Sequence, residues 1–355
     1  MPTARGASPV AIWAALLTLY VVWGSTYLAI RWAIDSIPPY LMISIRFFFA
    51  GGILLAWNAL RGELARGLPT RRELVDSAIV GTLLLCGGMG LVAWAELTVP
   101  TGVVALLVAV MPAWVALFGR LFFGERLVPL VVAGLVVGFV GVGLLIAPGL
   151  ATGNASLDPL GVGAVIVGPI LWASGSLYSA HRARLPRVPS LASALQMLSA
   201  AVVALLVAAL LGEYGRFEPA GITARAVGAL AYLVVVGSIV GFGAYVWLLR
   251  VAPLSKVTTY AFVNPVVAFI LGAVALAEPI TPTTVIAAAV IVAGVALIVT
   301  ARGRRTGGSP EETALAEEAA MAEAEGAGGA APATAHGTTM AGTPTGGRAR
   351  GDVER

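Results

Sequence analysis

Residues 100–125 read PTGVVALLVAVMPAWVALFGRLFFGE, and residues 253–278 read PLSKVTTYAFVNPVVAFILGAVALAE. Both stretches open on proline, carry a second proline twelve positions later and end on glutamate. The match extends over residues 80–147 and 233–300 at a constant offset of 153. Its coincident pairs are Pro100 and Pro253, Pro112 and Pro265, Glu125 and Glu278, Gly90 and Gly243, Trp94 and Trp247, Gly119 and Gly272, and Gly141 and Gly294. The chain therefore contains an internal repeat.

Apolar runs of about 20 residues, the length that crosses a bilayer as a helix, follow one another up to residue 300. They fall at 11–31, 39–60, 77–97, 101–119, 128–147, 160–180, 190–211, 226–249, 256–276 and 282–300. Near the start of each half the offset shifts to about 149, which aligns Trp23 with Trp172 and Ser25 with Ser174. Each repeat therefore holds five runs.

An odd number of spans forces the second repeat to cross the membrane in the opposite sense to the first. The sequence predicts an all-α membrane protein of ten transmembrane helices, built as two inverted five-helix repeats over 11–147 and 160–300. Inverted repeats favour an alternating-access transporter, and a duplicated scaffold is the alternative. Residues 301–355 are rich in Ala, Gly, Glu and Thr and are predicted to form a disordered cytoplasmic tail.

The composition also places the chain in a bilayer, with 59% hydrophobic residues, 11% charged residues and a mean hydropathy of +0.93. The net charge of +4 does not indicate nucleic-acid binding, because the basic residues are scattered through short loops beside apolar runs. Cys86 is the single cysteine, so no disulfide can form within the chain.

The loop arginines and lysine predict the orientation. With both termini in the cytoplasm, fifteen basic residues fall inside and three fall outside. The inner set is Arg5, Arg61, Arg66, Arg71, Arg72, Arg120, Arg126, Arg182, Arg184, Arg187, Arg250, Lys256, Arg302, Arg304 and Arg305, and the outer set is Arg31, Arg216 and Arg225.

Several short stretches carry a family resemblance. They are Tyr20–Tyr27, Pro38–Gly51, Ala95–Glu96 with Val99–Gly102, Trp172–Ser176 and Thr259–Val267. Through them, residues 11–300 resemble the EamA-type drug/metabolite transporter superfamily, and within it an exporter subgroup. Where that subgroup has His after Ala-Glu, this chain has Leu97, which removes one proton partner for Glu96.

The resemblance implies a multi-pass protein of the cytoplasmic (inner) membrane with ten helices and both termini cytoplasmic. It also implies a central cavity built mainly from the first, third, fourth, sixth, eighth and ninth spans. Members of the superfamily move amino acids, sugars, nucleotide derivatives and drugs, often outward. The resemblance therefore implies an exporter of small metabolites or drugs and leaves the cargo open.

Charge inside a bilayer is costly, so each intramembrane charge is a candidate for function. Arg46 lies about seven residues into the second expected span, where it could contact an anionic substrate, snorkel or bond helix-end carbonyls. Glu96 near the outer end of the third span could couple proton movement, or lie solvated at the interface. Glu125 and Glu278 occupy equivalent helix ends and are expected to fix those ends or pair with nearby arginines.

Polar and aromatic side chains are the better candidates for a substrate cavity. The predicted set is Trp23, Ser25, Thr26, Tyr27, Trp94, Trp172, Ser174, Ser176, Tyr245, Tyr260 and Asn264. Hydroxyls in membrane helices often bond their own backbone instead, and Trp and Tyr often anchor at interfaces. Pro112 and Pro265 are expected to weaken their helices as gating hinges.

The residue inventory argues against an enzyme. The chain has no H-E-x-x-H, G-x-S-x-G or Walker A pattern and no Asp in an expected span, so no metal, cofactor or ATP site is predicted. A membrane channel and a non-transporting scaffold or receptor remain the alternatives to a transporter. The expected partners are the small-molecule substrate and the lipid bilayer, and the oligomeric state stays open, a dimer included.

Overall fold

The computed structural model describes residues 8–151, 158–252, 257 and 259–305, and every regular element in these ranges is helical. The first repeat contains α1 (Pro9–Ile34), α2 (Pro39–Leu60), η1 (Leu64–Arg66), α3 (Arg71–Gly81), η2 (Thr82–Met89), α4 (Gly90–Ala95), α5 (Thr101–Val108), α6 (Met111–Phe123) and α7 (Pro129–Ala151). The second contains α8 (Pro159–His181), α9 (Pro189–Leu210), α10 (Glu213–Arg216), η3 (Pro219–Gly221), α11 (Ala224–Tyr232), η4 (Leu233–Val240), α12 (Gly241–Val251), α14 (Tyr260–Leu276) and α15 (Pro282–Arg305).

Most of the described helices overlap the expected apolar runs, while the short elements η1, α10 and η3 lie in the connections between runs. Eight of them are long and apolar enough to cross a membrane, and two further apolar helices, Ala224–Val240 and Tyr260–Leu276, are shorter. The third span begins at Arg71 rather than at residue 77 and therefore includes Asp76, so the expectation that no span contains Asp is wrong. Helix α15 continues to Arg305, and the rest of the expected tail, 306–355, lies outside the described residues.

Proline begins many of these helices. Its missing N–H costs nothing in the first turn, where backbone amides have no partner within the helix. The α-helices that have proline as their first residue begin at Pro9, Pro39, Pro129, Pro159, Pro189 and Pro282. The corresponding ends of α6 and α14 also match, because Gly124 (φ 70°) and Ala277 (φ 54°) both take the left-handed conformation at positions 153 residues apart.

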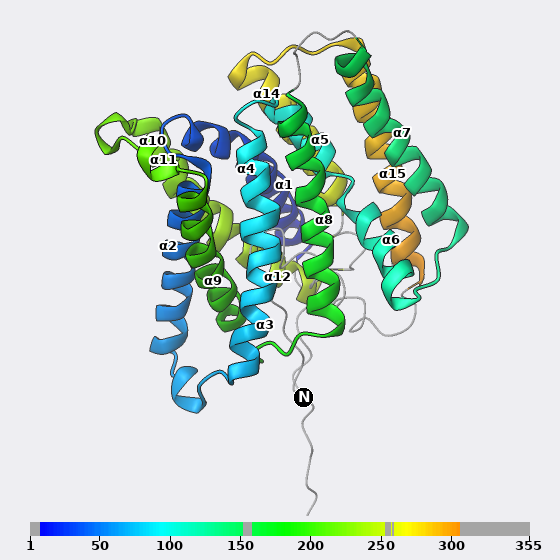
Figure 1. Ribbon diagram of the computed structural model, residues 1–355. Coiled ribbons are helices and arrows are strands. Elements are labelled where there is room, and N and C mark those ends of the chain that lie inside the picture. Colours follow the sequence, from blue (N-terminus) through cyan, green and yellow to red (C-terminus); the bar gives the residue numbers. More distant parts are fainter. Residues whose placement is uncertain (1–7, 152–157, 253–256, 258, 306–355) are drawn as a thin grey trace, which may run out of the picture.

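The packing of the helices repeats across the two halves (Figure 1). Helix α2 pairs with α9, α5 with α14 and α7 with α15, so each of these helices packs against its own counterpart in the other repeat. The segment α3-η2-α4 packs on α8, and its counterpart α11-η4-α12 packs on α1. This exchange of partners is the relation expected from an internal two-fold axis between inverted repeats.

Small residues allow two of these pairs to approach closely. A Cβ atom on Gly294 of α15 would lie 2.5 Å from the backbone nitrogen of Gly138 on α7, which leaves no room for a side chain. Between α2 and α9, Gly51 faces Met197, and α9 contributes the fully buried alanines Ala200, Ala204 and Ala208. Small residues bring membrane helices together because packing, rather than hydrophobicity, joins them in lipid.

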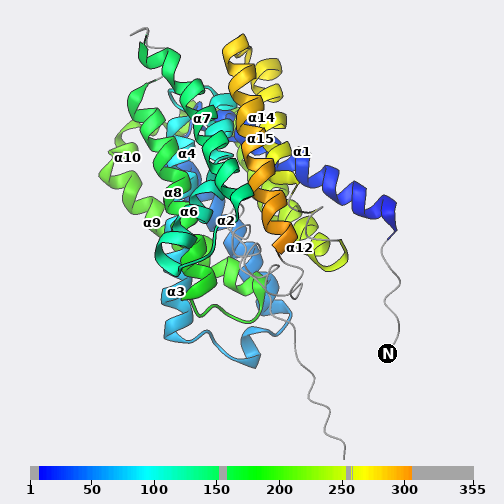
Figure 2. The same ribbon diagram turned by 90° about the vertical axis from the view of Figure 1, so that its right-hand side faces the viewer.

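The first helix is less covered than these pairs. Figure 2 shows the N-terminal part of α1 extending beyond the rest of the bundle, and Val10, Trp13, Leu17 and Val21 on it are exposed. The C-terminal part of α1 is instead buried against α14, α11 and α12. Buried residues are therefore denser toward the C-terminal end of α1, although Leu16 and Leu19 are also buried.

Three apolar segments are interrupted within the residues that the structure describes. The segments that begin with α3 and α11 carry π-helical turns, η2 and η4, which begin at Thr82 and Leu233 and so lie within two residues of equivalent places at the offset of 153. The fourth span is broken between α5 and α6 at Ala109 and Val110, just before Pro112. Such π turns are uncommon, and they are frequent at functional sites.

Two carboxylates complete helix ends across the repeat boundary. Helices α2 and α5 have Pro38 and Pro100 at their N-caps, and neither proline can supply a capping side chain. Glu213 instead accepts hydrogen bonds from the amides of Tyr40 (3.2 Å) and Leu41 (3.0 Å). Glu278 accepts from those of Thr101 (2.6 Å) and Gly102 (2.9 Å), so it fixes a helix end, but that of α5 rather than its own. A negative charge also stabilises the positive end of a helix dipole.

Candidate functional site

Three of the predicted aromatic residues meet between the two repeats. The ring centroids of Trp23 on α1 and Tyr260 on α14 are 5.0 Å apart in an edge-to-face arrangement, and Tyr245 on α12 lies 5.6 Å from Trp23. All three side chains are buried, together with Leu19 and Leu248. Helices α1, α12 and α14 therefore share an aromatic cluster, in which edge-to-face contacts add to the packing.

Asn264 lies one turn after Tyr260 on α14, close to the same part of α1. Its side chain is 9% exposed, and its Oδ1 atom has no hydrogen-bond partner among the described residues. Gly24 lies against this turn, because a Cβ atom there would be 3.2 Å from the Asn264 carbonyl oxygen. A buried amide oxygen without a partner is costly, which keeps Asn264 a candidate for contact with a ligand.

Arg46 is fully buried and reaches across the repeat boundary. Its Nε atom donates to the hydroxyl of Ser238 at 3.2 Å, and that hydroxyl donates to the Leu233 carbonyl at 3.0 Å. Ser238 and Leu233 belong to the π-helical turn η4, and Gly237 in the same turn faces both Thr26 and the Arg46 guanidinium. The guanidinium therefore packs against the backbone of η4 instead of snorkelling to the surface.

The hydroxyls of Ser25 and Thr26 on α1 differ in their hydrogen-bond partners. Ser25 hydrogen bonds to the hydroxyl of Tyr232 on α11 at 2.7 Å, so it joins the repeats. Thr26 donates to the Trp23 carbonyl of its own helix at 2.6 Å. Near the N-terminal end of the cluster, Tyr20 hydrogen bonds to Thr259. Ser25, Tyr20 and Arg46 thus connect α1 and α2 to the second repeat around the aromatic cluster.

The predicted residues of α8 lie apart from this cluster. Ser174 and Ser176 donate to the carbonyls of Ile170 and Trp172 in their own helix, both at 2.8 Å, as the structural alternative expected. Trp172 is buried against Gly88 of η2. Trp94 on α4 is half-buried between the two largest apolar clusters. Trp172 therefore faces the contact between α8 and the third span, and the hydroxyls of Ser174 and Ser176 are used within α8.

Glu96 is buried at the end of α4, with 1% of its surface exposed, so it is not a solvated interfacial residue. Neither of its carboxylate oxygens has a hydrogen-bond partner among the described residues. Arg31 donates to its backbone carbonyl at 3.2 Å rather than to its side chain, and also lies 3.7 Å from Asp35. Glu278 also acts electrostatically on Glu96, and Glu96 in turn acts on the buried Tyr27.

The two predicted hinge prolines have different surroundings. Pro112 follows the break between α5 and α6, whereas Pro265 lies inside the continuous helix α14. Pro112 and Pro265 occupy equivalent positions of the repeat. Among the described residues, however, only the segment that contains Pro112 is interrupted at this point.

Sequence reasoning missed several residues of this site. Ser238 hydrogen bonds to Arg46, and Tyr232 hydrogen bonds to Ser25. The one available signal was the glycine content of both π turns, with Gly87 and Gly88 in η2 and Gly237 in η4. Glycine alone does not predict a π turn, because it also serves close helix packing.

Replacing Ser238 with Ala removes the hydroxyl that Arg46 contacts across the repeat boundary. We expect a loss of about 1–3 kcal/mol in stability, because a buried charged group loses a hydrogen bond. Thermal unfolding of the detergent-solubilised protein measures this as a lower melting temperature. Ser174→Ala is the matched control, since its hydroxyl bonds only its own helix. Equal melting temperatures for the two variants would show that Arg46 does not depend on Ser238.

Comparison with known proteins identifies the relatives of the chain. The EamA-like transporter family model matches residues 10–147 and 159–300. The uncharacterized inner membrane transporter YedA of Escherichia coli K12 is 39% identical over 288 residues, covering 81% of this chain and 90% of YedA. A probable terminal-alkyne amino-acid exporter of Streptantibioticus cattleyicolor is 29% identical over 303 residues, covering 85% of this chain and 96% of the exporter.

A solved crystal structure also aligns with the fold. It covers 85% of this chain and 100% of its own, with a TM-score of 0.55 and 25% sequence identity. The apolar helices and the inner-membrane relative agree on a multi-pass protein of the cytoplasmic membrane, and the family is one of transporters rather than enzymes. The repeat, the helix packing and the two family matches together show that this chain is a member of the EamA-like transporter family.

Proposed function

We propose that the chain is a secondary active transporter that exports small metabolites or drugs across the cytoplasmic membrane by alternating access. The observation that carries the proposal is the gathering of aromatic and polar side chains where the two inverted repeats meet. Trp23 and Arg46 come from the first repeat, and Tyr260, Asn264 and Ser238 from the second. A ligand between them would contact both repeats, so their relative movement would change its access to each face.

The proposal includes ten spans with both termini in the cytoplasm. Eight long apolar helices and two shorter ones support this number, and α12 lengthens the helix that starts at Ala224 up to Val251. The excess of arginine in alternate connections supports the orientation. Under this topology, the end of the bundle that carries Arg71, Arg72, Arg182 and Arg184 faces the cytoplasm, and Glu96 lies near the outer face.

The same side chains favour a cargo with an apolar body and at least one charged or polar group. The three rings offer apolar and aromatic contact, the Arg46 guanidinium carries positive charge, and the Oδ1 atom of Asn264 accepts a hydrogen bond. An amino acid or a related small organic acid can offer an apolar body to the rings, a carboxylate to Arg46 and a hydrogen-bond donor to Asn264. The exporter name of the Streptantibioticus relative supports both the direction and this class of cargo.

A channel and a non-transporting scaffold or receptor are the competing functions. Polar residues between helices can line a pore as well as a carrier site. The inverted repeats favour the carrier, because a channel does not need two halves that exchange conformations. Exchange kinetics separate the three functions.

Comparative metabolomics of cells with and without the protein identifies candidate cargo, and counterflow in proteoliposomes tests it. We expect an unlabelled excess of the compound inside the vesicles to accelerate uptake of the labelled compound, since a carrier returns faster when loaded. A channel would give flux without this acceleration. The absence of flux for every compound that changed in the cells would favour a scaffold or receptor.

Glu96→Gln tests whether the buried carboxyl couples transport to protons. Burial disfavours the charged form of a carboxyl, so Glu96 would take up and release a proton only as the bundle opens. We expect the variant to exchange substrate but to lose export against a concentration gradient. The exposed Glu218→Gln serves as control. Uphill export that persists in Glu96→Gln would exclude this residue as the coupling site.

A further inference from the structure

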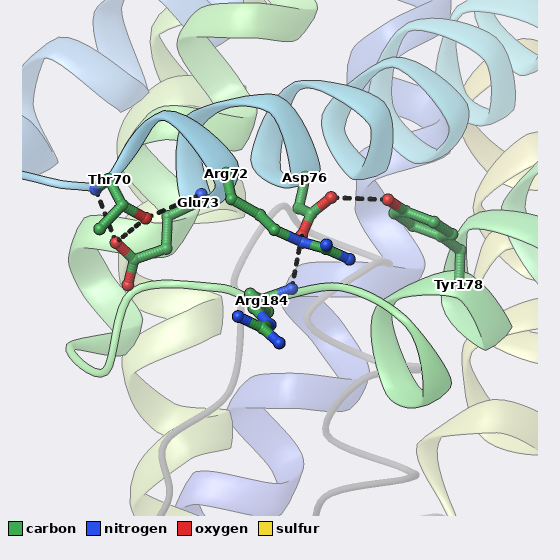
Figure 3. Close-up of polar contacts among 6 residues, drawn as sticks. All are labelled: Thr70, Arg72, Glu73, Asp76, Tyr178 and Arg184. Carbon is green, nitrogen blue, oxygen red and sulfur yellow. Dashed lines mark hydrogen bonds and ion pairs between the residues drawn. The ribbon is translucent and has the colours of Figure 1, made fainter.

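Asp76 is a buried carboxylate that lies outside the proposed cargo site. It is 3% exposed and accepts hydrogen bonds from the Tyr178 hydroxyl at 2.6 Å and from the Arg184 backbone amide at 2.7 Å. The Nε atom of Arg72 lies 3.4 Å from the same carboxylate. Figure 3 shows these groups converging on Asp76 from α3, from α8 and from the loop that follows it.

The contacts of Asp76 join the two repeats. Asp76 and Arg72 belong to α3, whereas Tyr178 and Arg184 belong to α8 and its following loop. The start of α3 is fixed by the capping box of Thr70 and Glu73, also drawn in Figure 3, so Asp76 projects from a well-anchored turn.

A second carboxylate holds the same end of α8 from another side. Glu125, which follows α6, lies 3.6 Å from the Nε2 atom of His181, and the ring of Phe123 stacks on His181 at 4.0 Å. The last turn of α8 is therefore held by residues from the third and fourth membrane segments of the first repeat.

The internal repeat shows that this arrangement belongs to one end of the bundle. The helix caps Thr70 and Thr223 are equivalent, which places Ala229 at the position of Asp76. In the equivalent pair of segments α1 takes the place of α8, and the offset of 149 places Ala29 of α1 at the position of Tyr178. Both alanines are buried. The equivalent positions at the opposite end thus hold two buried alanines where this end has a carboxylate and a phenol, although a hydrogen bond between Ser25 and Tyr232 joins the same two helices one turn away.

We propose that Asp76 and Tyr178 form a latch that keeps the repeats together at the arginine-rich end, and that access from that face requires its release. A short hydrogen bond to a charged acceptor is stronger than one between neutral groups, and burial strengthens it further. The free energy needed to open the arginine-rich end therefore differs from the free energy needed to open the other end, although the repeats are related by symmetry. The proposal rests on the proposed alternating-access function.

A single buried cysteine can report the opening. Ser77 follows Asp76 on α3 and is fully buried, so Ser77→Cys in a Cys86→Ala background places one thiol beside the latch. A membrane-impermeant maleimide is applied to inside-out vesicles, where the cytoplasmic face is accessible. Tyr178→Phe removes only the hydroxyl that donates to Asp76. We expect labelling about tenfold faster in this variant, from the loss of one hydrogen bond to a charged acceptor.

Thr98→Val is the matched control, because Thr98 donates to Asp158 at 3.0 Å between the same two membrane segments at their other end. We expect it to label at the parent rate. The same maleimide is applied to right-side-out vesicles to distinguish release from misfolding. A released latch exposes the introduced thiol to the cytoplasmic face only, whereas a misfolded protein would be labelled from both faces. Equal rates for Tyr178→Phe and the parent, faster labelling in Thr98→Val, or labelling from both faces would each overturn the latch.

The labelling requires no cargo, so it separates the latch from the proposed function. Latch-dependent labelling in a protein without substrate flux would overturn transport alone. If the protein exchanges substrate but Tyr178→Phe leaves the labelling rate unchanged, the latch alone would be overturned.

Discussion

Within lipid, every backbone amide and carbonyl must find its partner in the protein, and the rest of this structure depends on that constraint. It makes each apolar run a helix and makes each interruption of a helix costly. The interruptions that occur are therefore informative. The π turns η2 and η4 lie at contacts between the repeats, where Trp172 packs against η2 and Arg46 packs against η4.

The same constraint explains the carboxylates at helix ends. Pro38 and Pro100 cannot cap the helices that follow them, and Glu213 and Glu278 bind those amides from the other repeat. The second repeat therefore completes two helices of the first. Asp76 and Glu125 hold the last turn of α8 in a related way at the opposite end. Polar contacts between repeats thus concentrate at the two ends of the bundle, with the aromatic cluster and Arg46 between them.

Much of the fold could be predicted from the sequence, because its signals are long-range and redundant. The offset that aligns Pro100 with Pro253 and Glu125 with Glu278 also relates the left-handed residues Gly124 and Ala277. The site was less predictable. Ser174 and Ser176 share their residue type with Ser25, but only Ser25 reaches a partner in the other repeat, and helix rotation decides which hydroxyl does so. Asp76 was missed because its helix begins six residues before the apolar run.

The central claim is that the two repeats cross the membrane in opposite senses, and the side on which the connection between them lies tests it most directly. Reporter enzymes that are active on only one side of the membrane can be fused after Asn154, between the repeats, and after Thr306, beyond the last helix. Inverted repeats of five spans predict activity outside for the first fusion and inside for the second. Both fusions reporting the same side would contradict an odd number of spans in each repeat, and with it the inverted arrangement.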